Sequence, residues 1–251
     1  MRYAVELAYR GTNYHGWQIQ PNASSVQAEV EKQLSRLMGG VPTSVVGCGR
    51  TDTGVHASYY VLHFDTEHSL DCDELVYKLN KMLPADIAVF GVQNVPDEFH
   101  ARFSATARTY RYFIHSKKDA FRMDSLLLAK PIDFEAMNQA GNQLIGTKDF
   151  TSFSKLHTDV KTNICTVTAA KWIQDEAGWY FEITADRFLR NMVRATVGTL
   201  LGTGFGVLEI SDIQYILEAK DRAAAKLSVS AAGLFLTDVV YPENLFLKKA
   251  Q

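Results

Sequence analysis

The sequence predicts an α+β protein made of two similar halves, residues 1–105 and 106–251. Two observations support this. Hydrophobic periodicity switches between the strand and helix patterns along the chain, and the order β-α-β-β-α-β occurs twice. A length of 251 residues also suits one large domain or two small ones. Because this order is that of a ferredoxin-like unit, we expect two tandem ferredoxin-like halves whose sheets meet around a central cleft.

The first half contains four predicted strands and two predicted helices. Ser24 and Gln27 have the spacing of a capping box before the first helix, and Pro84 ends the second helix. The elements are strand 2–9, helix 24–38, strands 43–47 and 59–65, helix 71–83 and strand 87–95.

The second half repeats the order without sequence identity to the first. Its first strand should place Tyr110 and Tyr112 on one face and Arg111 and Phe113 on the other. The elements are strand 109–116, helix 133–145, strands 164–172 and 179–184, helix 190–201, an extra helix 211–219 and strand 234–241.

Composition excludes several classes of protein. With 47% hydrophobic and 22% charged residues, the chain is not intrinsically disordered. Three scattered cysteines are too few for a disulfide framework or a zinc motif, and they favour a reducing, cytoplasmic location. No apolar run reaches membrane-spanning length, and Glu6 interrupts the start where a signal peptide needs its apolar core.

The net charge of −2, from 26 basic and 28 acidic residues, argues at first against a nucleic-acid partner. The charges are segregated, however. Residues 65–98 hold eight acids and two bases, whereas residues 99–118 hold five bases and residues 187–208 three, both without an acid. Aromatic residues interleave with the bases, as phosphate attraction and base stacking require. Solvated charged faces are the alternative interpretation.

A glycine-rich loop, residues 47–57, is the densest candidate for chemistry. It places Arg50 and Asp52 two residues apart between predicted strands. A turn in which Asp52 caps its own backbone is the alternative. The loop lacks the patterns of a P-loop and of a dinucleotide-binding turn.

Residues 49–57 (GRTDTGVHA) resemble the GRTDxGVHA motif of the TruA family of tRNA pseudouridine synthases. Further segments resemble other motifs of that family in the same order along the chain. They are 9–18 (YRGTNYHGWQ), 103–112 (FSATARTYRY), 188–194 (FLRNMVR) and 233–236 (GLFL). Arg10 and Thr53 depart from the commonest family residues, Asp and Ala.

The resemblance implies isomerisation of uridine to pseudouridine at positions 38–40 of the tRNA anticodon stem-loop. It implies no cofactor, no metal, a base flipped out of the stack and a homodimer. Asp52 would be the catalytic aspartate, either adding to the sugar or abstracting a proton from it.

The resemblance also assigns residues around Asp52. Arg194 would be its ionic partner, with Arg190 on the same helix face. Tyr110 would stack on the target base, Arg50 would help displace the target nucleotide, and Leu234 would form an apolar wall. The alternatives are solvated arginines and a tyrosine packed in the core.

Other functions remain as alternatives. A non-catalytic RNA-binding module could stack bases on Tyr110 and Phe113 but gives no reason for Asp52. Zinc binding by histidines lacks ligand spacing, and serine hydrolysis lacks a nucleophile elbow. We expect His56 to support the glycine-rich loop. The histidines and serines considered are His15, His56, His63, His100, Ser152 and Ser154.

Overall fold

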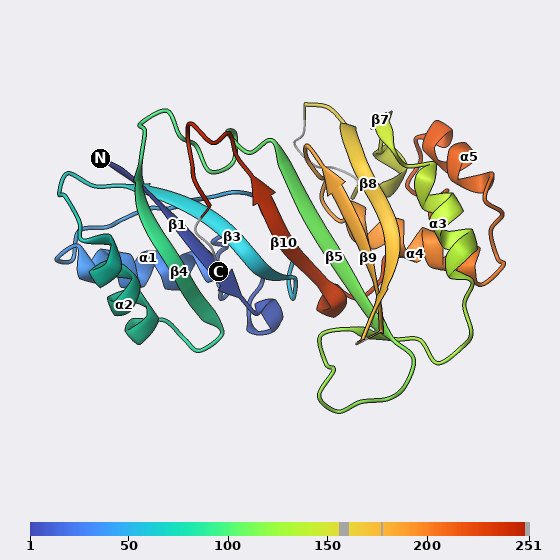
Figure 1. Ribbon diagram of the computed structural model, residues 1–251, viewed down its shortest axis with the longest axis horizontal. Helices are drawn as coiled ribbons and strands as arrows, with labels where there is room; N and C mark the ends of the chain where they lie inside the picture. The colour runs from blue at the N-terminus through green and yellow to red at the C-terminus, as the bar shows by residue number, and fades with distance from the viewer. Residues whose placement is uncertain (156–160, 177, 249–251) are drawn as a thin grey trace. The chain divides into compact units, whose positions relative to one another are not determined.

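The computed structural model describes residues 1–155, 161–176 and 178–248 (Figure 1). Within them lie five α-helices and ten strands, most of them paired antiparallel, which confirms the α+β class. The chain divides into two compact units. The first unit is Met1–Ala107 together with Leu236–Gln251, and the second is Arg108–Phe235.

The first unit is an antiparallel sheet with two helices on one face (Figure 1). Its elements are β1 (Arg2–Tyr9), α1 (Val26–Leu37), β2 (Val46–Gly47), β3 (His56–Asp65), α2 (Cys72–Met82), β4 (Ile87–Val95) and, from Leu236 on, β10 (Leu234–Val240). β1 lies between β4 and β3, β2 pairs with β3, and β10 follows β3 in strand order. The loop between β2 and β3 carries Asp52.

The second unit has the strand order β5-β9-β8-β7, with β6 parallel to β5. Its elements are β5 (Ala107–His115), β6 (Leu126–Leu127), α3 (Phe134–Asn142), β7 (Gly146–Asp149), β8 (Ile164–Asp175), β9 (Gly178–Ala185), α4 (Met192–Gly204) and α5 (Asp212–Ala219). Tyr110 and Tyr112 are buried, whereas Arg111 and Phe113 are half-buried, which confirms the predicted alternation along β5. The short β6 and the polar β7 were not predicted.

The capping-box prediction at the start of α1 is wrong. Ser25 caps the helix, since its Oγ accepts the Ala28 N–H at 3.3 Å. Ser24 Oγ instead donates to the Asn13 carbonyl at 3.0 Å, and the Gln27 side chain turns along the helix toward Glu31. Both serines can act as an N-cap, but only Ser24 has a glutamine three residues later, and in the structure it bonds Asn13 while Ser25 caps the helix.

α4 begins two residues later than predicted. Its N-cap, Asn191, has a φ of 67°, in the left-handed region that breaks a right-handed helix. Arg190 therefore lies outside α4, and the prediction that Arg190 and Arg194 share a helix face is wrong. The helix continues to Gly204, beyond the predicted end.

The predicted strand 43–47 shrinks to Val46–Gly47. The Thr43 N–H donates to Ser35 Oγ at 2.8 Å, and the Val45 N–H donates to Glu31 Oε1 at 2.9 Å. These amides bind side chains of α1 rather than a neighbouring strand. The three cysteines carry free thiols, as expected. None of the helices in the described residues is long and apolar enough to span a membrane.

A buried histidine on β3 should make the stability of the fold depend on pH. Burial lowers the pKa of His63 to about 4, and its Nδ1 accepts the Ala101 N–H at 3.1 Å. In the unfolded chain this histidine has its ordinary pKa of 6.5. Between pH 6.5 and about 4, unfolding therefore takes up a proton, so stability falls as the pH falls. We expect the free energy of unfolding to drop by about 2 kcal/mol from pH 7 to pH 5 through this group. Urea unfolding of the unaltered protein and of His63→Gln at both values tests this, and equal pH dependence in the two would contradict it.

Candidate active site

Asp52 lies in a tight turn of the first unit. Its side chain is half-buried, between the buried Thr51 and the exposed Thr53. The Val55 N–H donates to the Asp52 carbonyl at 3.1 Å, and Gly54 inside the turn has a φ of 77°. Such a φ favours glycine, which explains one glycine of the loop. A hydrogen bond within the turn therefore holds the main chain that carries Asp52.

The segment Tyr9–Gln18, which resembles the opening motif of the TruA family, holds this turn through its main chain. The Trp17 N–H donates to the Thr51 carbonyl at 3.4 Å, and the Gly54 N–H donates to the Tyr14 carbonyl at 3.3 Å. These hydrogen bonds join the two segments at Thr51 and at Gly54, on either side of Asp52.

Two glycines of that segment allow main chain to touch main chain. A Cβ on Gly11 would overlap the carbonyl of Val55, and a Cβ on Gly16 would overlap the carbonyl of Thr51. Gly16 also has a φ of 92°. Any larger residue at these positions must push the Asp52 turn out of place.

His56 supports the loop, as expected. It is fully buried at the start of β3, and its Nδ1 accepts the Gly11 N–H at 3.1 Å. His100 is used similarly, with Nδ1 accepting the N–H groups of Arg102 and Phe103, both at 3.2 Å. Across the part of the chain that the structure describes, no group of three or more His, Cys, Asp or Glu side chains could hold a metal ion.

The other four predicted site residues divide between the units. Arg50 is exposed on the same loop as Asp52, in the first unit. Tyr110, Arg194 and Leu234 belong to the second unit.

Tyr110 lies on β5 opposite Ile183 of β9. It is 9% exposed, and its ring meets Phe188 edge to face at 5.1 Å between centroids. Its edge-to-face contact with Phe188, which lies in the same unit, fixes the orientation of the ring.

Arg194 lies in the first turn of α4. Its Nε donates to the Val229 carbonyl at 2.8 Å, and the Val229 N–H donates back to the Arg194 carbonyl at 3.2 Å. This reciprocal pair fixes the direction of the guanidinium group, whose Nη atoms carry its other donors. Leu234 is 5% exposed at the start of β10 and can serve as an apolar wall.

Arg111, in the basic stretch 99–118, pairs with an acidic residue that lies far from it in the sequence. Arg111 Nη2 lies 2.8 Å from Glu182 Oε2 on the neighbouring strand, and its guanidinium lies over the Tyr180 ring at 4.7 Å. Arg111 thus stabilises the β5–β9 pair, and its charge is offset locally.

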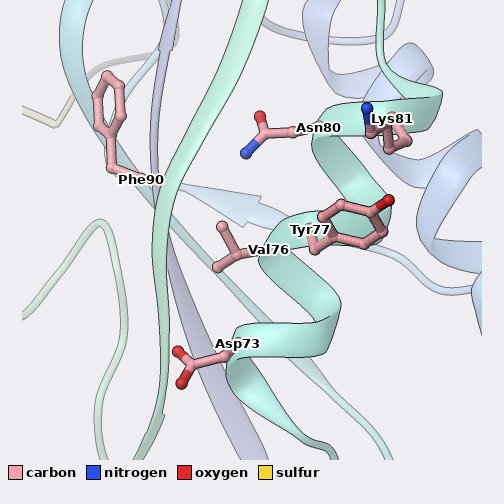
Figure 2. A pocket seen from close by; sticks show the side chains of 6 residues that line it. All are labelled: Asp73, Val76, Tyr77, Asn80, Lys81 and Phe90. Atoms are coloured by element: carbon pink, nitrogen blue, oxygen red, sulfur yellow. The ribbon is translucent and has the colours of Figure 1, made fainter.

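A surface depression lies between α2 and β4, away in sequence from the Asp52 loop (Figure 2). It is lined by Asp73, Val76, Tyr77, Asn80, Lys81 and Phe90. Figure 2 shows Val76 and Asn80 pointing from the helix toward the strand. The Asn80 amide bonds both the N–H and the carbonyl of Val89, each at 2.8 Å. Its polar atoms therefore join α2 to β4.

A family model described as tRNA pseudouridine synthase matches residues 7–104 and 140–242. The chain belongs to this family. The proteins named tRNA pseudouridine synthase A from Parabacteroides distasonis and Bacteroides fragilis are 53% and 52% identical to it, each over 98% of both chains. The protein of that name from Bacillus subtilis is 40% identical over 96% of this chain and 99% of its own.

The matched segments contain four of the five predicted site residues. The first includes the loop with Arg50 and Asp52, and the second includes Arg194 and Leu234, while Tyr110 lies between them at the end of the motif 103–112. Sequence reasoning did not single out Tyr60, whose hydroxyl reaches this loop. Strand alternation indicates burial but does not reveal a contact with a loop eleven residues earlier.

Proposed function

We propose that this protein isomerises uridine to pseudouridine at positions 38–40 of the tRNA anticodon stem-loop. The observation that carries the proposal is a nearly full-length family match that includes the GRTDTGVHA loop, in which the Asp52 turn is fixed by its own main chain. The relatives' name supports tRNA as the partner.

The reaction breaks the bond between the sugar C1′ and uracil N1, turns the base and joins C1′ to uracil C5. C5 loses its proton and N1 gains one, so the product is an isomer of the substrate. The base must first leave the stack to expose these atoms. An ionised carboxylate at Asp52 can add to the electron-poor C1′, as carboxylates do in glycoside hydrolysis, or abstract a proton from the ribose. Neither route requires a group outside the protein.

Four further residues have roles in this proposal. Arg194 is the ionic partner of Asp52, and the bond to Val229 that fixes its direction supports this role. Tyr110 stacks on the flipped base, and its fixed ring supports stacking. Arg50, exposed beside Asp52, displaces the target nucleotide, and Leu234 lines the pocket.

Because these residues come from both halves, we propose that ferredoxin-like halves 1–105 and 106–251 form the catalytic cleft. The order β4-β1-β3-β2 in the first unit and β5-β9-β8 in the second supports the ferredoxin-like assignment. We further propose that the protein acts as a cytoplasmic homodimer. Three free thiols suit that compartment.

Modification of an unmodified tRNA transcript, with pseudouridine mapped by nucleotide, tests the proposed function. We expect pseudouridine only at uridines 38–40. A matched transcript with cytidine at those positions should gain none. Pseudouridine confined to other positions would overturn the proposed specificity, and its absence from every uridine-containing transcript would overturn the activity.

We expect Arg194→Ala to lose turnover rather than tRNA affinity. A charge-assisted hydrogen bond contributes roughly 1.5–3 kcal/mol, so the rate on bound tRNA should fall about ten- to a hundredfold. The dissociation constant should stay within a few-fold of the unaltered protein. Single-turnover rates and filter-binding measurements check both quantities.

Arg190→Ala is the matched control, because it removes the same charge outside α4. It should keep the single-turnover rate of the unaltered protein. If Arg194→Ala weakens binding alone, Arg194 is a phosphate contact and not the partner of Asp52.

A further inference from the structure

Two buried tyrosine hydroxyls reach the loop immediately before Asp52. Tyr60 Oη donates to the Gly49 carbonyl at 2.5 Å. Tyr9 Oη and Thr51 Oγ1 share a hydrogen bond of 2.8 Å. The tyrosines come from β3 and β1, so the central strands of the first unit hold the loop at two points on either side of Arg50.

We propose that Tyr9 and Tyr60 are positioning residues, whose hydroxyls set the place of the Asp52 carboxylate without contacting tRNA. The inference rests on the proposed function. It adds to that function by attributing part of the rate of pseudouridine formation to residues that support the loop from behind.

The rings behind these hydroxyls are held by one another and by Trp17. Trp17 stacks on Tyr60 at 4.1 Å between centroids, and Tyr9 meets Tyr60 at 5.4 Å. All three side chains are at most 3% exposed. A Cβ on Gly47 would overlap both the Tyr60 hydroxyl and the Trp17 ring, so the space around that hydroxyl is filled. In such packing the rings do not move to follow a displaced loop.

The hydroxyls, and not the rings alone, matter for position. Phenylalanine would fill the same ring volume but would remove the hydrogen bond to the loop. A buried hydroxyl needs such a bond to offset its loss of hydration. Here the bonds go to Thr51, which is next to Asp52, and to Gly49, three residues before it. Because a misplacement of about 1 Å can cost roughly a hundredfold in rate, two anchors at this point affect catalysis directly.

Tyr59 provides a matched control on the same strand. It is 2% exposed, and its hydroxyl donates to Glu6 Oε2 at 2.7 Å, on β1 and not on the loop. Tyr59→Phe therefore removes an equally buried hydroxyl from the adjacent position while leaving both loop anchors in place.

Single-turnover pseudouridine formation, tRNA binding and thermal unfolding should be measured for Tyr9→Phe, Tyr60→Phe and Tyr59→Phe. We expect Tyr9→Phe and Tyr60→Phe to lower the rate on bound tRNA about tenfold each, with the dissociation constant within twofold. Tyr59→Phe should lower the melting temperature but keep the rate within twofold. Adding Thr51→Val to Tyr9→Phe should lower the rate little further, because the two substitutions remove the same hydrogen bond.

Amide hydrogen exchange in the free proteins separates this inference from the proposed function, because it needs no tRNA. The loop amides of residues 49–55 should exchange faster in Tyr60→Phe than in Tyr59→Phe. Unchanged exchange would overturn the anchoring even if the protein is an active synthase. Faster exchange in a protein that modifies no transcript would support the anchoring and overturn the function. A rate loss in Tyr59→Phe equal to that in Tyr60→Phe would show a general effect of stability and overturn the positioning role.

Discussion

We expect the Asp52→Asn protein to form no detectable pseudouridine in a transcript that the unaltered protein modifies. The amide has the size of the carboxylate but carries no negative charge, so it can neither add to the sugar nor take a proton from it. The single-turnover rate should fall at least roughly a thousandfold, as with other residues that act on the reacting atoms. Mapping of pseudouridine after long incubation with excess enzyme measures the residual rate.

The binding of tRNA should survive this substitution within a few-fold, because the role proposed for Asp52 is in the chemical step. Asp73→Asn, which neutralises an exposed carboxylate at the start of α2, should leave both rate and affinity unchanged. Full activity in Asp52→Asn would overturn the assignment of Asp52.

Periodicity predicted the α+β class and the placement of most elements because burial in this protein follows local pattern closely. In β5, for example, Tyr110 and Tyr112 are buried and Arg111 is not. The errors occur where a tertiary contact decides between two choices that the local sequence allows. The start of α1 depends on Ser24 bonding Asn13, and the start of α4 depends on the left-handed Asn191.

The candidate site could likewise be predicted only in part from the sequence. The motif itself predicts Asp52 and Arg50 as site residues, since both lie within nine consecutive residues. The support beneath them cannot be deduced from spacing, because the Tyr9 and Thr51 hydroxyls meet across 42 positions. The pairing of Arg111 with Glu182 joins residues 71 positions apart, so counting charge by segment overstated the basic character of that stretch.

The Gly16→Ala substitution should damage both folding and catalysis, because this glycine touches the main chain that carries Asp52. Its φ of 92° strains any side-chain-bearing residue, and the added methyl group would overlap the Thr51 carbonyl. We expect the free energy of unfolding to fall by about 3–4 kcal/mol. The single-turnover rate of the remaining folded protein should fall about a hundredfold, since Thr51 and Asp52 must move together.

Gly39→Ala separates the two causes. Gly39 also has a positive φ, 71°, but nothing lies within 4 Å of the position its Cβ would take. It should therefore show the conformational cost alone, about 1–2 kcal/mol, with an unchanged rate. Urea unfolding and single-turnover kinetics on the two variants compare these costs. If Gly16→Ala behaved like Gly39→Ala in both measurements, contact with the Thr51 carbonyl would not fix the Asp52 turn, and the turn would be held from the β-sheet side alone.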